Sequence, residues 1–256
     1  MTATTPDPTV TACWRYPVKS CQGLEVGELE LTATGIAGDR THGLIDVATG
    51  RLMTAKRTAA LLGAVATDHG ITLPDGTAHA FGDPGIDEAL STWLGRPVHL
   101  AEAGTAGDTS FEMTFDPPNE DAEVFEIPTP PGTFLDVSAV HLVTTATLAG
   151  CAEARPDLDW DVRRFRPNLL IADDGPAFAE DAWIGHRLAI GTAVLEVTGP
   201  MLRCAMPLRP QPGLEREPGL FAAMSELHEA FPNHLGLMAN VVTPGAVRLG
   251  DAVVVA

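Results

Sequence analysis

Basic residues are scarce in this chain. Of its 256 residues only 16 are Lys or Arg, against 34 Asp or Glu, so the formal net charge at pH 7 is -18. Because a surface of this charge repels a phosphate backbone, the composition excludes general binding to nucleic acid or to an anionic membrane. Any anion site must be local and built from a few cations.

The chain also lacks long apolar runs and closely spaced cysteines. No stretch reaches the roughly 18 apolar residues that a membrane-spanning helix needs, and the first ten residues, MTATTPDPTV, do not resemble a secretion signal. The four cysteines are scattered without CxxC spacing, which argues against a zinc knuckle or a dense disulfide framework. We expect a cytoplasmic protein of a reducing compartment, with no membrane association.

Common catalytic motifs are missing as well. The eight histidines occur singly without HExxH spacing, so no histidine-based metal site is expected. The sequence contains no GxSxG, Walker loop or GxGxxG, which excludes the usual serine hydrolase, P-loop and dinucleotide-binding classes.

What is present favours a β protein. With 45% hydrophobic residues the chain is globular, and 21 prolines with 25 glycines suit many turns better than a helical bundle. Period-two alternation and turn signals predict short strands, and apolar spacing of three and four predicts helices. The predicted strands are 24–31, 44–46, 52–54, 140–144, 169–172, 187–190, 193–198, 236–242 and 247–255, the last with a turn at 250–251, and the helices are 83–94, 145–154 and 217–231. Residues 104–133, rich in proline, suit a long connection and a domain boundary.

Cations gather in three loops. Lys19 and Ser20, with Arg40, combine a point charge, a hydroxyl and a planar fork that suit phosphate oxygens, although an exposed turn and a local ion pair would explain them too. Arg163, Arg164 and Arg166 precede an apolar strand, where either an anion site or a solvated loop is possible. Lys56-Arg57 is expected to be a solvated turn.

The third cluster is Arg203-Cys204, which follows a strand and a Gly-Pro turn. A thiol beside a permanent cation favours its thiolate, the form that attacks electrophiles and binds soft metals. Most lone cysteines are nevertheless small core residues, and Cys204 alone does not decide between the two interpretations.

Taken in order, the motifs resemble the MOSC family, the C-terminal domain of molybdenum cofactor sulfurase, preceded by its N-terminal β-barrel partner. The resemblance covers about residues 10–256. It rests on Tyr-Pro-Val-Lys-Ser-Cys at 16–21, Gly-Asp-Arg at 38–40, Ala-Lys-Arg at 55–57, Arg-Phe-Arg-Pro-Asn at 164–168, Trp-Ile-Gly at 183–185, Arg-Cys at 203–204 and Pro-Gly-x-Val-x-x-Gly-Asp at 244–251.

The resemblance implies a mainly β fold of two β-barrel-like domains with a few short inserted helices, an N-terminal β-barrel domain at 1–110 and a MOSC domain at 111–256. It implies a molybdenum cofactor, molybdenum on molybdopterin, with Cys204 as metal ligand and catalytic residue. The family's cofactor contacts fall on Lys19, Ser20, Arg40, Val137, Ser138, Arg166, Asn168, Leu202 and Arg203.

The function that follows is an oxidoreductase that reduces N-hydroxylated or N-oxidised small molecules with electrons from a separate donor protein. Two alternatives stay open: a sulfur carrier or transferase with a persulfide on Cys204 and a sulfur-donor protein, and a protein that binds the cofactor without catalysis. The oligomeric state is not predicted. Where relatives continue Arg-Cys with a Thr-rich segment, this chain has Ala205-Met206-Pro207-Leu208, and we expect it to differ from them there.

Overall fold

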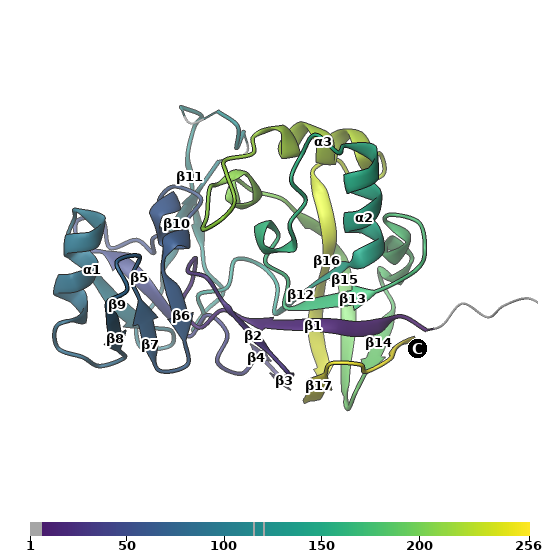
Figure 1. Ribbon diagram of the computed structural model, residues 1–256. Helices are drawn as coiled ribbons and strands as arrows, with labels where there is room; N and C mark the ends of the chain where they lie inside the picture. Colours follow the sequence, from purple (N-terminus) through teal and green to yellow (C-terminus); the bar gives the residue numbers. More distant parts are fainter. Residues whose placement is uncertain (1–6, 115, 120) are drawn as a thin grey trace, which may run out of the picture.

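The computed structural model describes residues 7–114, 116–119 and 121–256. Strands contain 36% of the chain and helices 18%, so the mainly β prediction is confirmed. Figure 1 shows a larger sheet with helices α2 and α3 beside it, and a group of small strands with helix α1 on the other side of the molecule.

An eight-stranded sheet curls into a half-barrel. Its strands are, in spatial order, β18 (Val253–Val255), β14 (Arg187–Ile190), β15 (Ala193–Leu202), β16 (His234–Thr243), β12 (Val140–Thr144), β13 (Leu169–Ala172), β1 (Thr9–Arg15) and β2 (Leu24–Val26). Neighbouring strands are antiparallel except β12 and β13. These two are parallel because helix α2 (Thr145–Ala154) lies between them in sequence and carries the chain back across the sheet.

The remaining strands form four small sheets. They are β17 (Gly245–Arg248) with β3 (Glu28–Thr32) and β4 (Gly35–Ile36); β5 (His42–Asp46) with β9 (Val98–Glu102); β6 (Val65–Thr67), β7 (Gly70–Thr72) and β8 (Ala78–Ala80); and the hairpin of β10 (Ser110–Met113) and β11 (Phe125–Pro128).

Short helices connect the strands. The α-helices are α1 (Ile86–Leu94), α2 and α3 (Gly219–Leu227), and the 3-10 helices are η1 (Ala59–Gly63), η2 (Val162–Arg164), η3 (Ala179–Trp183) and η4 (Met206–Leu208). The Thr144 hydroxyl accepts a hydrogen bond from the Thr147 amide, which caps α2, and Gly95 ends α1 in the left-handed conformation at φ 67°. Within the described residues, no helix is long and apolar enough to cross a membrane.

Most predicted elements are confirmed, and three predictions are wrong in detail. Residues 52–54 form no strand; Leu52 makes a single bridge to Ile45. The connection at 104–133 contains the β10–β11 hairpin, whose alternation is short and interrupted by prolines. Helix α3 is shorter than the predicted 217–231 at both ends: Pro218 precedes its first turn, and the backbone leaves the helical conformation at His228.

Two hydrophobic cores flank the site described below. The first fills the half-barrel, where β15 alternates buried Leu195 and Val197 with outward Glu196 and Thr198. The second lies under α1 and the small sheets and includes Leu44. Strands β1 and β3 pair with β13 and β17, so the first strands of the chain complete the half-barrel. The proposed domain boundary at residue 110 stays a prediction.

Candidate functional site

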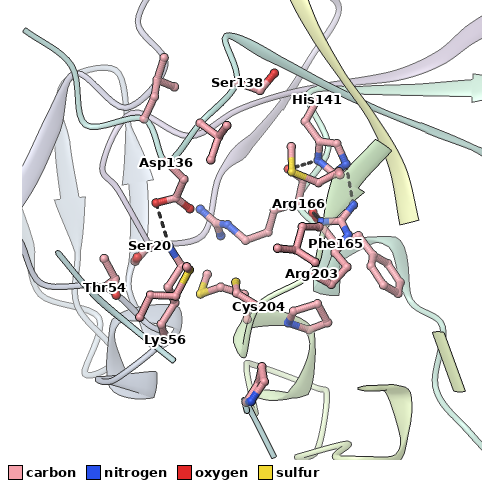
Figure 2. Close-up of a pocket in the computed structure, with 18 of the residues that line it drawn as sticks. Ser20, Thr54, Lys56, Asp136, Ser138, His141, Phe165, Arg166, Arg203 and Cys204 are labelled. Atoms are coloured by element: carbon pink, nitrogen blue, oxygen red, sulfur yellow. Dashed lines mark hydrogen bonds and ion pairs between the residues drawn. The ribbon is translucent and has the colours of Figure 1, made fainter. Parts of the chain in front are cut away.

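A cavity of about 370 Å³ lies between the two halves of the chain (Figure 2). The residues singled out from the sequence come from five separate segments, yet all of them line this one cavity. They are Lys19, Ser20, Arg40, Val137, Ser138, Arg166, Asn168, Leu202, Arg203 and Cys204. Val137 and Leu202 are 69% and 50% exposed, which places them at the mouth of the cavity.

Cys204 is the accessible thiol of the chain. Its backbone leaves strand β15 at Leu202, and the Arg203 amide donates to the Asn233 carbonyl at 2.8 Å, which fixes the start of the loop. All four cysteines are free; Cys204 is partly exposed, and the other three are buried. Burial raises the pKa of Cys13 to about 11 and that of Cys151 to about 12, so these thiols are inert at neutral pH.

The Arg203 guanidinium joins three segments around Cys204. Its Nε donates to the Leu235 carbonyl at 2.8 Å, Nη1 donates to the Phe165 carbonyl at 3.1 Å, and Nη2 donates to Nε2 of His141 at 2.6 Å. Burial lowers the pKa of Arg203 to about 9, so the group stays charged at neutral pH. Because its donors bond to acceptors on three separate segments, Arg203 holds the Cys204 loop in place.

His141 completes this contact as a neutral imidazole. Burial, and next the charge of Arg203, lower its pKa well below the usual value. Since Nε2 accepts from Arg203, the proton is on Nδ1, which donates to the Arg166 carbonyl at 3.3 Å. His141 therefore links the Arg166 loop to the Cys204 loop.

Tyr16 lies between two further cations. The Arg40 and Arg166 guanidinium carbons are 5.0 Å and 4.2 Å from the centre of its ring, and the buried phenol donates to the Pro167 carbonyl at 2.9 Å. The Tyr16 amide donates to Asp39, and the Asp39 carboxylate pairs with Arg40. The aromatic ring thus holds two arginines side by side at the cavity despite their like charge.

Backbone strain is concentrated at the same place. Five non-glycine residues in the described part of the chain have positive φ, and four of them line the cavity: Ser20 (69°), Arg40 (50°), Arg166 (53°) and Asn233 (62°). This conformation is costly for residues with a side chain and persists where the surrounding structure imposes it, most often at functional sites. The strain supports a functional role for this cavity.

Two buried lysines of the cavity share one carboxylate. Oδ1 of Asp136 accepts from Nζ of Lys19 at 2.7 Å and lies 2.9 Å from Nζ of Lys56. Both ammonium groups lie over the Phe111 ring, at 5.1 Å and 3.8 Å from its centre. The expectation that Lys56-Arg57 is a solvated turn is wrong for Lys56, which is 4% exposed, because Asp136 compensates its charge inside the cavity.

The cavity carries an excess of positive charge. Six cations line it: Lys19, Arg40, Lys56, Arg164, Arg166 and Arg203. In the described part of the chain three carboxylates pair with them, Asp39 with Arg40, Asp136 with both lysines and Asp159 with Arg164, which leaves three positive charges unmatched. Nη2 of Arg166 is buried without a hydrogen-bond partner. In a chain of net charge -18 this arrangement fits a multiply charged anion.

The remaining predicted contacts are partly used by the protein itself. The Ser20 hydroxyl accepts from the Ala55 amide at 3.0 Å, and the Ser138 hydroxyl donates to the Val140 carbonyl at 2.7 Å. The Asn168 amide accepts from the His141 backbone and donates to the Trp14 carbonyl, both at 3.2 Å. Each side chain therefore also fixes a strand or turn that forms the cavity wall.

The three arginines at positions 163, 164 and 166 have different roles. Arg163 is exposed and pairs with Asp161. Arg164 is 1% exposed and donates to the Pro207 and Glu215 carbonyls, which fixes the segment after Cys204. Nε of Arg164 and Nη2 of Arg166 are both buried without a hydrogen-bond partner, but in the described part of the chain Arg166 is the one of these three arginines that pairs with no carboxylate.

Sequence reasoning missed Tyr16, Lys56, Asp136 and His141 as parts of the site. Asp136 stands directly before Val137 and Ser138, and Tyr16 begins the motif that contains Lys19, so both were adjacent to identified residues. Nothing in the sequence marks His141, because its role depends on Arg203, which approaches it only in the folded chain.

We expect Asp136→Asn to destabilise the protein by about 1–3 kcal/mol, because it leaves two buried ammonium groups without a counter-charge. Burial alone would raise the pKa of Asp136, but both lysines hold it well below the usual range. The Asp136 carboxylate therefore stabilises the folded protein at pH values above the ordinary carboxyl pKa, and this stabilisation is lost as the pH falls below it. Thermal unfolding of the original protein and of the Asp136→Asn variant between pH 7 and pH 3 checks this. We expect the difference between their unfolding free energies to shrink in acid, and a difference that stays constant would contradict the account.

The chain is thus mainly β, and its cation-lined cavity presents one accessible thiol. Residues 129–254 match the MOSC domain, and residues 7–77 match the MOSC N-terminal beta barrel domain. The chain therefore belongs to the MOSC family, which is associated with the molybdenum cofactor.

Two named relatives share modest identity with the chain. The human protein "Mitochondrial amidoxime-reducing component 1" is 25% identical over 96% of this chain and 82% of its own length. "Molybdenum cofactor sulfurase" from Oryza sativa subsp. japonica is 26% identical over 75% of this chain, which spans only 27% of the rice protein.

Among solved structures, the chain matches the YUAD protein from Bacillus subtilis with a TM-score of 0.44 and 11% identity over 98% of this chain and 96% of that one. YiiM from Geobacillus stearothermophilus has a TM-score of 0.36 and 13% identity over 59% of this chain and 72% of its own.

Proposed function

We propose that this protein is a molybdenum-cofactor oxidoreductase that reduces N-hydroxylated or N-oxidised small molecules. The observation that carries the proposal is the excess of three positive charges around a cavity that also presents the Cys204 thiol. Phosphate and pterin groups need local cations and oriented donors, and a thiolate is the protein ligand that a soft metal prefers. The name of the human relative supports the reaction class.

The residues present fit such a cofactor. Arg166, with its unpartnered Nη2, and Arg40 would bind phosphate oxygens, with Lys19 and Ser20 facing them across Asp136. Cys204 would bind the metal through Sγ. Val137, Ser138, Asn168 and Leu202 would contact the pterin. When bound, the cofactor would supply the two-electron redox chemistry.

The chain's own residues orient the reaction. Arg203 and His141 hold the Cys204 loop against strand β16, and the tyrosine between Arg40 and Arg166 fixes the phosphate-binding arginines. Reduction of an N–OH group consumes two electrons and two protons and yields N–H and water. We propose that a separate protein donates the electrons, because the four cysteines of the chain are separate and do not form an iron–sulfur motif.

Protein from cells grown with molybdate tests the proposal, with reduced methyl viologen as electron donor and benzohydroxamic acid as substrate. We expect conversion to benzamide, and loss of that activity when the cells are grown with tungstate instead. Activity that is independent of molybdate would contradict the proposal.

Anion binding should weaken above pH 8. Burial lowers the pKa of Lys19 to about 8 and that of Arg203 to about 9, so both cations are charged at pH 7 and largely neutral at pH 9.5, and the Lys19 variant separates the part that Lys19 contributes. We expect the affinity of the cofactor-free protein for sulfate, which does not titrate in this range, to fall about tenfold between these pH values. Calorimetric titration measures it. Lys19→Gln serves as the control and should bind weakly at both pH values, whereas an equal pH dependence in the variant would exclude Lys19 as the cause.

A second candidate is a sulfur carrier that uses a persulfide on Cys204. Its support is the exposure of Cys204 alone among the four cysteines, together with the name of the rice relative. A cysteine desulfurase persulfide would transfer its outer sulfur to the Cys204 thiolate and leave as a thiolate. Mass spectrometry should then find 32 Da added at Cys204 only, as the mass of one sulfur atom requires. Sulfur on several cysteines, or on none, would exclude this candidate.

A further inference from the structure

Methionines form a second feature of the cavity, distinct from its cations. Four of the seven methionines line it: Met113 from β10, Met201 from β15, Met206 from η4 and Met238 from β16. We call these four the methionine wall. All four are partly exposed, whereas Met53 and Met224 are 6% and 1% exposed and belong to the hydrophobic cores. The accessible methionines of the described chain therefore gather at this cavity.

The methionine wall is backed by packed structure on both sides of the cavity. Met113 packs on the core cluster that contains Phe111, and Met206 packs on the cluster under helix α1. Further apolar side chains, among them Ile127, Leu135 and Phe221, line the cavity with them. Thioether side chains adapt to ligands of different shape and make favourable contacts with aromatic rings. The wall thus suits an organic ligand with an aromatic or alkyl body.

The charges around the cavity restrict the ligand further. In the described chain Asp136 is the one carboxylate that lines the cavity, and it is bonded to two lysines, so a cationic ligand finds no free counter-charge. The Arg203 guanidinium is occupied by protein acceptors. If the unmatched cations bind the cofactor phosphate, as proposed above, no free cation is left for an anionic substrate. The ligand of the wall is therefore uncharged.

We propose that the methionine wall binds the apolar body of an uncharged organic substrate and so presents the substrate's reacting group to Cys204. Small inorganic oxyanions such as nitrate, which have no apolar body, are excluded as substrates. The identity of the reacting group rests on the proposed function, but the binding of an apolar body does not.

Methyl NMR of protein labelled at the methionine methyl groups tests the proposal, with signals assigned by Met→Leu variants. Benzohydroxamic acid should shift the four wall methyls, while the buried Met53 and Met224 serve as internal controls. Acetohydroxamic acid should bind at least tenfold more weakly, because it lacks the ring. In the cofactor-loaded protein, where the cofactor would occupy the unmatched cations, nitrate should leave the wall methyls unmoved. Equal affinity for the two hydroxamic acids, or wall methyls that do not respond, would overturn the proposal.

The titration is repeated on protein with and without the cofactor. Wall methyls that respond in both forms support a substrate site, whereas a response lost in the loaded form would assign the wall to the cofactor and overturn the proposal. If the protein never acquires molybdenum, the proposed function fails. The titration of the cofactor-free protein still tests whether the methionine wall binds an apolar body.

A matched pair of variants checks the role of the thioether. Met206→Gln has the same length but a polar end, and we expect it to weaken benzohydroxamic acid binding about fivefold or more. Met206→Leu should stay within about twofold of the original protein. Cofactor content and the unfolding midpoint, measured for both, show that the fold is intact. Equal binding by the Gln and Leu variants would contradict an apolar contact at Met206.

Discussion

Cys204→Ser should reduce the turnover of benzohydroxamic acid by at least about 1,000-fold, the loss expected when a metal ligand that tunes the reacting centre is replaced. The serine hydroxyl is not deprotonated at neutral pH and is a poor ligand for a soft metal. Because Cys204 is partly exposed, the substitution should leave the unfolding midpoint nearly unchanged. Turnover and molybdenum content, measured on the same preparation, check both parts.

Cys151→Ala is the matched control. Cys151 is a residue of helix α2, is 1% exposed and is not among the residues that line the cavity. We expect this variant to lose some stability and to keep its molybdenum and its turnover per folded molecule. Equal turnover in the two variants would remove Cys204 from the mechanism.

Arg203→Met should produce the second large effect, a loss of stability on the order of 3 kcal/mol or more. The substitution removes a buried cation and leaves the Leu235 and Phe165 carbonyls and Nε2 of His141 without their donor. For a chain of this size the unfolding midpoint should fall by roughly 6–12 °C. We also expect loss of cofactor retention, because the Cys204 loop is no longer held against strand β16.

Arg163→Met separates the loss of a particular arginine from the loss of charge. Arg163 pairs with Asp161 on the surface, and exposed pairs of this kind contribute little. Its unfolding midpoint should stay within about 1 °C of the original protein. If both arginine variants behave alike, the structural role assigned to Arg203 is wrong.

The sequence predicts the fold well where local pattern decides it. The short apolar runs of β12, β13 and β14 predict the bounds of these strands to the residue. The pattern fails at Leu52, which is buried by contact with Ile45 and not by pairing in a sheet, and in the proline-interrupted β10–β11 hairpin. Such contacts depend on segments distant in sequence.

Some residues of the site could likewise be predicted from the sequence, and others could not. Lys19, Arg166 and Cys204 stand out because cations are scarce and because their motifs resemble a known family. The partners that set their state do not stand out. His141 is neutral and Asp136 contacts two lysines because both residues are buried beside groups that folding brings close. No local sequence pattern encodes these contacts.

The structure shows what the segment Ala205-Met206-Pro207-Leu208 does, where relatives have a Thr-rich segment. Ala205 is 2% exposed, Pro207 accepts a hydrogen bond from Arg164 through its carbonyl, and Met206 lines the cavity. The segment lacks hydroxyl groups and contributes an apolar surface beside the thiol. We therefore expect substrate preference to be decided here and at the other three residues of the methionine wall.

Elemental and pterin analysis of the purified protein tests the central claim most directly. Protein made in cells that synthesise the cofactor should contain close to one molybdenum and one pterin per chain, and Arg166→Ala, which removes the guanidinium with an unpartnered donor, should contain far less of both. A chain that folds in such cells and carries neither molybdenum nor pterin would contradict the account.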